Sequence, residues 1–382
     1  MTQTINSIEL FSGAGGLAKG LELAGAHHKA FVEWNTDACK TLRVNFDPSI
    51  VYEGDVRSFN FLDYSGVDII AGGPPCQPFS LGGKAKGSDD KRDMFPYAVA
   101  AIRQLTPKAF IFENVKGLLR DSFAEYFEFI ILQLQYPEVT FCSDNWRDNY
   151  STLKKILTHK EYRGITYDVQ YKLVNAADYG VPQKRERVII VGFRSDLNVE
   201  WKFPLPTHSE DALLWQKYVT GEYWQRHGTT DIDVSAEEAK VIKRQLMNRY
   251  GMWPPEHKPW QTIRDAVSSL ELISDRSGAE FLFRDGAKEY PGHTGSLIDE
   301  PSKTIKAGAH GVPGGENMIK FNDGTVRYFS VAEAKRIQTF PDEYIIVGAW
   351  SEAMRQLGNA VPVELAKIVA TSVISKIIFE NS

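Results

Sequence analysis

Short apolar runs alternate with stretches of helical periodicity over the N-terminal third of the chain. Between the first two runs, Leu17, Leu21 and Ala24 share one face of a predicted helix. The runs themselves are bounded by polar or turn-forming residues and predict buried strands at residues 7–11, 30–32, 51–56, 67–71 and 109–112. This order of elements indicates an α/β fold built on an open sheet.

Four of these strands end at or near a functional group. The groups are Glu33, Asp55, Cys76 and Glu113, and a glycine-rich turn follows the first strand. In open α/β sheets the ligand crevice lies outside the carboxyl ends of the strands. We therefore expect the four groups and the turn to converge on one site.

The fourth strand leads into Gly-Gly-Pro-Pro-Cys at residues 72–76, which forces the chain into a stiff turn with a thiol at its tip. A cysteine in this position is either packed by chance or presented as a nucleophile. The other cysteines, Cys39 and Cys142, form no CxxC spacing, which argues against a disulfide framework and a zinc site. We interpret Cys142 as a buried or incidental thiol.

The turn after the first strand carries the spacing Gly13-x-Gly15-x-x-Ala18, and Glu33 lies 20 residues beyond Gly13. A strand, a glycine turn and a helix bring a ligand close to backbone N–H groups at the helix N-terminus. The spacing fits a dinucleotide-binding fingerprint, but ordinary tight turns share it. Glu33 suits ribose hydroxyls and the Trp34 indole suits a purine. The alternative is a surface glutamate beside a packed tryptophan.

Two basic segments are candidates for contacts with nucleic acid. Residues 81–92 are rich in glycine and lysine and form either a surface loop or a lid over the cysteine whose lysines meet phosphates. Farther along, a polar cluster opens a strand in which alternation places Arg185 and Arg187 on one face. Such arginines suit either structural ion pairs or contacts with phosphates and base edges.

The pattern changes after residue 200. Prolines and glycine clusters punctuate residues 201–323, which we interpret as a second, irregular domain. Residues 1–200 form the first domain in this interpretation, and residues 324–382 return to it. Ser330 and Glu333 form a predicted capping box in this last part.

Composition restricts the class of protein without selecting one. The 382 residues are 43% hydrophobic and 24% charged, which is ordinary for a globular protein. The sequence has no membrane-spanning apolar run and no signal peptide, and its cysteine usage fits a reducing compartment, so we expect a cytoplasmic protein. The net charge of −5 neither requires nor excludes nucleic acid, because a local basic surface can bind phosphates on an acidic protein.

In the order of its motifs the chain resembles the DNA (cytosine-5) methyltransferases over nearly its full length. The most specific segments are Pro-Pro-Cys-Gln at 74–77, Glu-Asn-Val at 113–115 and Gln-Lys-Arg-Glu-Arg at 183–187. The other matching segments are Phe-Ser-Gly-Ala-Gly-Gly at 11–16, Glu-Trp at 33–34, Gly-Asp-Val at 54–56, Arg-Ile-Gln-Thr-Phe-Pro at 336–341 and Gly-Asn-Ala-Val at 358–361. The resemblance implies a doubly wound, mostly parallel sheet with a smaller target-recognition domain.

The resemblance also implies that S-adenosylmethionine is the cofactor. Glu33 would bind its ribose, Trp34 would pack on its adenine, and Asp55 with Val56 would hold the adenine edge. The remaining expected contacts are Phe11, Ser12, Gly13, Gly15, Gly16, Leu17, Pro75, Met94, Asn359 and Ala360.

Two positions depart from the family pattern. Glu9 stands where the family usually has aspartate, which adds one methylene outside the glycine turn. Ala360 stands where a hydroxyl residue is common, so one hydrogen bond to the cofactor is expected to be missing.

By the same resemblance, Cys76 adds to C6 of cytosine and makes C5 able to attack the methyl group. Cysteine suits this step because it is intrinsically nucleophilic. Glu113 follows an apolar strand, and burial there favours the protonated carboxyl group that would hydrogen-bond N3. Arg187 would hold O2 of the base, and Arg185 would support the pocket. Because the ring is attacked from its face, the base must flip out of the helix.

The expected substrate is a specific sequence in duplex DNA, and its expected contacts are Ser80, Lys84, Lys86 and Gln183. We expect a monomer and a cognate restriction endonuclease that acts independently. An RNA (tRNA) cytosine-5 methyltransferase with the same motifs is the nearest alternative. A nucleotide-dependent oxidoreductase explains the glycine turn but not Pro-Pro-Cys, and an inactive DNA-binding module is disfavoured because no catalytic motif residue is missing.

Overall fold

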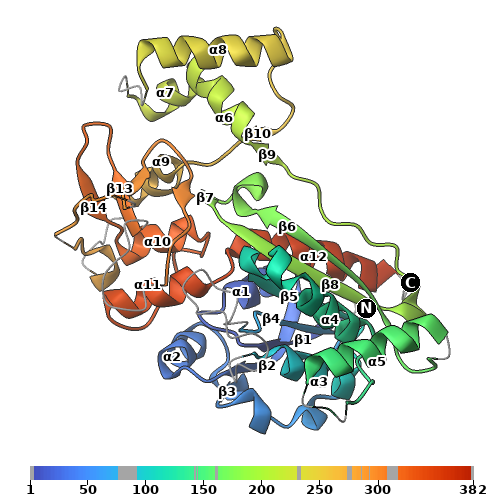
Figure 1. Cartoon of the computed structure of the whole chain (residues 1–382). Coiled ribbons are helices and arrows are strands. Elements are labelled where there is room, and N and C mark those ends of the chain that lie inside the picture. Colours follow the sequence, from blue (N-terminus) through green and yellow to red (C-terminus); the bar gives the residue numbers. More distant parts are fainter. Residues whose placement is uncertain are drawn as a thin grey trace. The chain divides into compact units, whose positions relative to one another are not determined.

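The chain divides into two compact units in the computed structural model (Figure 1). Unit 1 comprises residues 1–174, 186–203 and 367–382, and unit 2 comprises residues 175–185 and 204–366. The structure describes residues 4–75, 93–141, 143, 145–159, 162–229, 234–272, 278–284, 286–291, 293–307 and 317–379.

A seven-stranded sheet with the order β3-β2-β1-β4-β5-β8-β6 forms the centre of unit 1 (Figure 1). Its strands are β1 Ile5–Leu10, β2 Ala26–Glu33, β3 Val51–Glu53, β4 Ile69–Gly72, β5 Ala109–Val115, β6 Tyr167–Asn175 and β8 Glu186–Arg194. The first five strands pair in parallel, and β8 runs antiparallel to β5. This sheet confirms the predicted α/β fold and its mostly parallel topology.

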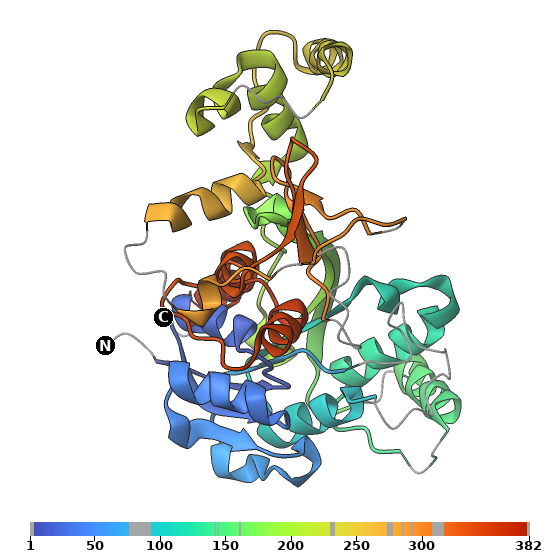
Figure 2. The ribbon, with the colours of Figure 1, turned by 90° about the vertical axis from the view of Figure 1, so that its left-hand side faces the viewer.

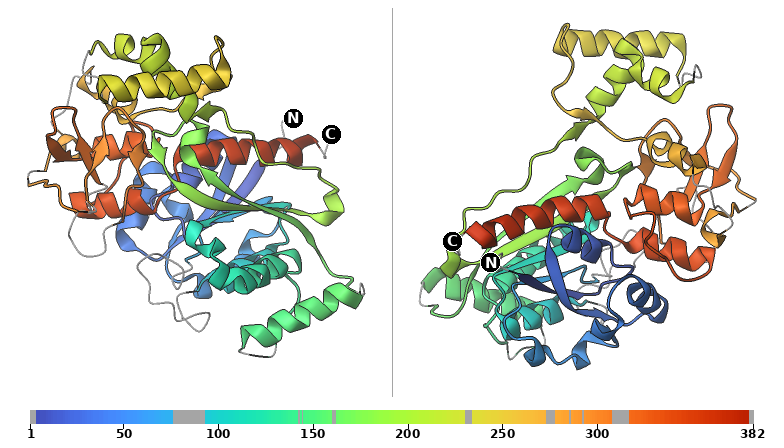
Figure 3. Two further views of the ribbon diagram at one scale, coloured as in Figure 1. Left: turned by 45° about the horizontal axis from the view of Figure 1, so that its top comes forward. Right: turned by 180° about the vertical axis from the view of Figure 1, so that it is seen from behind.

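The two faces of the sheet pack against different helices. The helices are α1 Gly16–Leu23, α2 Thr36–Asn45, α3 Phe95–Leu105, α4 Ala124–Gln135, α5 Trp146–His159 and, from residue 367 on, α12 Val363–Phe379. Ala30 and Val32 of β2 lie in one apolar cluster with α3 and α4, whereas Phe31 lies in a second cluster with α1 and α2. Helices therefore cover both faces of the sheet (Figure 3), which is the doubly wound arrangement that buries parallel strands.

Unit 2 consists of short strands and helices. Three small sheets pair β11 Ser296–Leu297 with β13 Met318–Lys320 and β14 Val326–Tyr328, β7 Gln183–Lys184 with β12 Ser302–Lys303, and β9 His208–Ser209 with β10 Lys258–Pro259. The helices are α6 Glu210–Trp215, α7 Glu222–His227, α8 Ala236–Tyr250, α9 Ile263–Val267, α10 Val331–Ile337 and α11 Trp350–Asn359. The capping box of Ser330 and Glu333 opens α10 as the sequence predicted. Among the helices that the structure describes, none is both long and apolar enough to cross a membrane.

Two expectations from the sequence differ from the structure: one concerns a domain boundary and the other the strand near Arg185. The return to the first domain was expected at residue 324, but α10 and α11 pack within unit 2, so the contacts place it at residue 367. The single strand expected to carry both arginines is interrupted at Arg185. β7 pairs with β12, whereas β8 pairs with β5. The alternation of side chains along one strand therefore does not place Arg185 and Arg187 on the same face.

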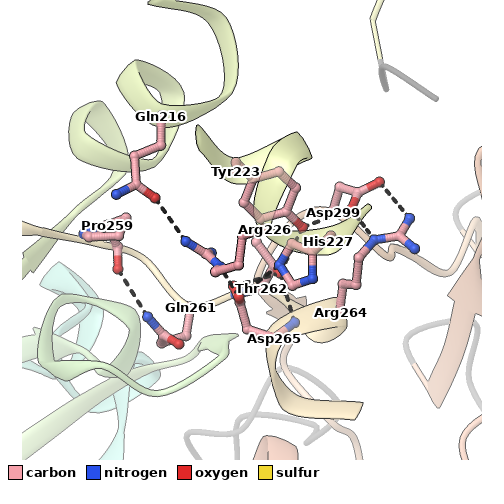
Figure 4. Close-up of polar contacts among 10 residues, drawn as sticks. All are labelled: Gln216, Tyr223, Arg226, His227, Pro259, Gln261, Thr262, Arg264, Asp265 and Asp299. Carbon is pink, nitrogen blue, oxygen red and sulfur yellow. Dashed lines mark hydrogen bonds and ion pairs between the residues drawn. The ribbon is translucent and has the colours of Figure 1, made fainter. Parts of the chain in front are cut away.

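A buried polar network joins α7 to α9 in unit 2 (Figure 4). Asp265 accepts hydrogen bonds from the Thr262 backbone at 2.9 Å and hydroxyl at 2.8 Å, contacts the His227 ring at 2.9 Å and forms a 2.8 Å ion pair with Arg226. Burial by itself raises the pKa of Asp265, but the His227 and Thr262 hydrogen bonds and the Arg226 charge outweigh it and hold the pKa at about 2. Ionised Asp265 therefore fastens the two helices together.

This network predicts a loss of stability in acid. Because the folded-state pKa is depressed, the stabilisation by Asp265 is complete above about pH 4 and is lost as the pH falls towards about 2. Asp265→Asn should lower the free energy of unfolding by about 2 kcal/mol at neutral pH and flatten its dependence over that range. Urea denaturation at several pH values measures both effects. Asp63→Asn, at an exposed position in unit 1, is the control, and an equal effect of the two variants contradicts the assignment.

Candidate active site

The parallel strands bring their carboxyl ends to one edge of the unit 1 sheet. Glu33 closes β2, Gly72 closes β4, and Glu113 lies near the end of β5. Asp55 follows β3, which ends at Glu53 and is shorter than the sequence suggested. Three of the four expected groups thus lie along the same edge of one sheet, and Cys76 lies outside the described residues.

The turn between β1 and α1 is built from left-handed backbone conformations. Gly13 has φ of 53°, Gly15 has φ of 78°, and Phe11 adopts φ of 56° although it is not glycine. The N-cap residue of α1 is Gly15, which has no side chain to form a capping hydrogen bond. Among the described residues, a Cβ atom on Gly13 would meet no atom within 4 Å, so they leave space for a ligand in front of the turn.

Backbone amides hold Glu33 in a fixed orientation beside this turn. Its Oε2 accepts from Gly13 N–H at 2.8 Å, and its Oε1 accepts from Trp34 N–H at 3.0 Å and Asn35 N–H at 2.8 Å. Glu33 itself is 7% exposed, whereas the neighbouring Trp34 is 78% exposed. A buried carboxylate, an open turn and a free indole face fit the ribose, the methionine part and the adenine of S-adenosylmethionine.

The Asp55 carboxylate already forms hydrogen bonds with Arg57. It accepts from the backbone N–H and the Nε–H of Arg57, both at 2.9 Å, and these bonds lower the pKa of Asp55. Val56 is buried, in the first turn of a 3-10 helix. The adenine of a bound cofactor would therefore form its hydrogen bond with a carboxylate that Arg57 also contacts.

Glu9 is an unusual buried acid at the end of β1. It is 2% exposed, and its Oε2 has no hydrogen-bond partner among the described residues. Burial, and secondly the charge of Glu33, raises the pKa of Glu9 well above its usual value. Burial therefore favours the uncharged form of Glu9.

Two hydrogen bonds fix the prolyl turn that precedes Cys76. Asn114 donates through Nδ2 to the Pro74 carbonyl at 2.9 Å, and Met94 donates its backbone N–H to the Pro75 carbonyl at 3.0 Å. Sequence reasoning missed this role of Asn114, although the residue stands inside the Glu-Asn-Val motif. The side chain ties the turn after β4 to the end of β5.

Several predicted residues lie outside the described part of the chain: Cys76, Ser80, Lys84, Lys86 and Cys142. Among the described residues, Cys39 is a buried free thiol in α2. Burial, and secondly the charge of Glu33, raises the pKa of Cys39 to about 12, so this thiol is not a nucleophile.

Glu113 forms an ion pair with Arg187, whose Nε lies 2.6 Å from Glu113 Oε1. Both side chains are nearly buried, with exposures of 11% and 13%. The facing strands β5 and β8 bring the two side chains together. The sequence pattern did not predict this ion pair, since it depends on the pairing of β5 with β8.

Arg185 and Gln183 are structural residues within unit 2. Arg185 is 1% exposed and donates through Nη2 to the Gly358 carbonyl at 3.0 Å. Gln183 is fully buried, donates to Gln338 Oε1 at 3.1 Å and accepts from the Ile305 N–H at 3.2 Å. Its burial and satisfied amide argue against the expected DNA contact by Gln183.

Two further expected cofactor residues follow Gly358 in unit 2. A Cβ atom on Gly358 would come within 2.4 Å of the Ala307 backbone nitrogen, so this glycine permits close packing of two segments. Asn359 is exposed and Ala360 is 7% exposed. Their contacts with a cofactor stay predictions.

Comparison with known proteins identifies a family for this arrangement. The family model of the C-5 cytosine-specific DNA methylases matches residues 5–137 and 146–375. The chain is 30% identical to the Type II methyltransferase M.NgoMIV of Neisseria gonorrhoeae, over 98% of this chain and 99% of that protein. It is 32% identical to the Type II methyltransferase M.Sau96I of Staphylococcus aureus, over 97% of this chain and 75% of that protein.

Solved structures share the fold at lower sequence identity. A DNA modification methyltransferase encoded within an Escherichia coli prophage aligns with a TM-score of 0.58 and 21% identity, over 98% of this chain and 99% of that chain. The Dnmt2 methyltransferase of S. pombe aligns with a TM-score of 0.55 and 15% identity, over 99% of each chain. These likenesses support the architecture of the chain.

The glycine pair before the prolyl turn generates a prediction. A Cβ atom on Gly72 would lie 2.3 Å from the Leu10 carbonyl oxygen of the adjacent strand, whereas a Cβ atom on Gly73 would lie 3.5 Å from Glu113 Oε2, an ordinary contact. Gly72→Ala should therefore lower the free energy of unfolding by about 1–3 kcal/mol. Gly73→Ala is the matched control and should change it little. Urea denaturation compares the two variants, and equal stabilities would refute the close strand packing.

Proposed function

Because the chain belongs to the C-5 cytosine-specific DNA methylases and methylates C5 of cytosine in DNA, we propose that it does so with Cys76 as nucleophile and S-adenosylmethionine as methyl donor. We further propose that the substrate is a specific sequence in duplex DNA. The family match confirms the resemblance found in the sequence and favours DNA over RNA as substrate. Neither the RNA nor the oxidoreductase alternative has support in these comparisons.

One observation carries the catalytic proposal. The Asn114–Pro74 hydrogen bond joins the turn that leads to Cys76 to the strand that carries Glu113. The bond fixes the chain two residues before Cys76 to the strand that carries Glu113, and the proposal requires that the thiol and the acid act on the same base.

The proposed reaction begins when the Cys76 thiolate forms a bond to C6 of a flipped cytosine. The C5–C6 π electrons move towards N3, which takes a proton from Glu113, so that C5 becomes an enamine carbon. S-adenosylmethionine supplies an electrophilic methyl group on a sulfonium sulfur. C5 would form a bond to the methyl carbon as the methyl–sulfur bond breaks, which leaves S-adenosylhomocysteine. A base then removes the C5 proton as the thiolate leaves C6, and N3 returns its proton to Glu113, which restores the aromatic ring.

The Glu113–Arg187 ion pair has a consequence for this sequence of steps. Arg187 neutralises Glu113 before a base enters, and the pair keeps two nearly buried charges from standing alone. In the proposed reaction Arg187 turns to O2 of the entering cytosine, which frees Glu113 to hydrogen-bond N3.

The cofactor proposal rests on the turn after β1. Glu33 is oriented by three backbone amides, so that its carboxylate is a fixed acceptor for the ribose. Trp34 offers a free ring face, and the uncapped N-terminus of α1 suits a carboxylate. The Type II relatives fit a modification enzyme of a restriction–modification system, whose nuclease would act independently.

Replacement of the nucleophile tests this proposal. Cys76→Ser should abolish transfer of labelled methyl groups to DNA, because a serine hydroxyl is a far weaker nucleophile than a thiolate. Binding of S-adenosylmethionine, measured by calorimetry, should persist. Cys39→Ala is the matched control and should keep its activity, since the Cys39 thiol is buried. Near wild-type transfer by Cys76→Ser would remove Cys76 from the mechanism.

A further inference from the structure

Two large apolar residues that are neighbours in the sequence are exposed on unit 2. Met252 is 85% exposed and Trp253 is 81% exposed, which makes them the most exposed large apolar side chains in the part of the chain that the structure describes. No ring contact or cation–π contact involving Trp253 occurs among the described residues. Adjacent exposed apolar groups of this size mark an interaction site more often than they occur by chance.

The backbone presents this pair on a fixed support. Met252 and Trp253 directly follow α8, where Gly251 ends the helix with φ of 64° and donates its N–H to the Met247 carbonyl at 2.9 Å. The backbone N–H of Trp253 donates to the Tyr250 carbonyl at 3.3 Å. Pro254 and Pro255 then restrict the backbone of the chain that follows.

The end of α8 is itself anchored to the neighbouring helix. Tyr250 donates its hydroxyl to Asp211 of α6 at 2.6 Å, and Arg249 forms an ion pair with the same carboxylate. The Tyr250 ring also packs edge-on against Trp215 at 6.4 Å. Helices α6 and α8 accordingly pack together in unit 2 (Figure 2). Met252 and Trp253, the apolar tip, therefore follow an anchored helix end.

Cations outnumber carboxylates along α8. Residues 239–255 contain four cations and no carboxylate, while Glu237, Glu238 and Glu256 stand at the two ends of this segment. Lys240 pairs with Glu237 and Arg249 pairs with Asp211, but Lys243 and Arg244 form no ion pair within the described part of unit 2. Both side chains are exposed, so one face of α8 has uncompensated positive charge.

We propose that the basic face of α8 and its apolar tip form a contact surface for duplex DNA. In this arrangement Lys243 and Arg244 contact phosphates, while the Trp253 indole and Met252 enter a groove and pack on sugars and bases. A polyanion with apolar base faces matches both halves of the surface, since apolar wedges beside cations are a common way of gripping DNA. A second copy of this chain fits less well, because two such faces would bring like charges together.

Binding measurements separate the two halves of this surface. With a plasmid DNA fragment that the wild type methylates, Trp253→Ala should weaken binding about tenfold, and Trp253→Phe should restore most of it. Lys243→Gln and Arg244→Gln should each reduce the slope of log K against log salt by about 1. Leu62→Ala, which removes a 69% exposed side chain in unit 1, is the matched control and should bind as the wild type does. Unchanged affinity and salt slope in the α8 variants would overturn the proposal.

Crosslinking tests the contact without depending on affinity. The photoreactive residue p-benzoylphenylalanine at position 253 should crosslink to the DNA fragment, and the same residue at position 62 should not. Crosslinks from position 253 to another protein chain alone, or no crosslink at all, would contradict the proposal. The inference rests on the DNA-methylating function. Methyl transfer by the wild type in the same sample distinguishes failure of that function from failure of the α8 contact. Transfer without a crosslink refutes the α8 contact alone.

Discussion

The close parallel pairing of β1 with β4 and of β4 with β5 is the constraint on which unit 1 depends. Parallel pairing places the ends of these strands at one edge, and the contact is so tight that Gly72 has no room for a side chain beside Leu10. The Asn114–Pro74 hydrogen bond fixes the prolyl turn to this edge of the sheet. The chain that leads to the proposed nucleophile is therefore fixed by backbone geometry as far as Pro75.

The acidic groups at this edge differ in what surrounds them, and that difference assigns their roles. Backbone amides hold Glu33 as a fixed acceptor, burial raises the pKa of Glu9, and Arg187 pairs with Glu113. The proposed roles of Glu33 with the ribose and of Glu113 with the base rest on these different surroundings. The same principle operates in unit 2, where Arg185 is buried against backbone carbonyls and organises the segment around Gly358.

Much of this arrangement could be predicted from the sequence, because it depends on local patterns. The strands, the glycine turn and the placement of Glu33 and Glu113 at one edge of the sheet follow from periodicity and from the rule that parallel strands end together. The break at Arg185 and the burial of Gln183 could not be predicted, since both depend on β7 pairing with a strand more than a hundred residues away. Asn114 was overlooked for a similar reason: the role of its side chain depends on the carbonyl of Pro74 in another strand's turn.

The central claim is that Cys76 forms a covalent bond to C6 of the target cytosine. Duplex DNA in which 5-fluorocytosine replaces cytosine measures this directly, because fluorine at C5 blocks the elimination that releases the enzyme. Incubation with S-adenosylmethionine, followed by proteolysis and mass spectrometry, should find the modified base attached to the peptide that contains Cys76. An enzyme that methylates ordinary DNA but forms no adduct, or forms one at Cys39 or Cys142, would contradict the account.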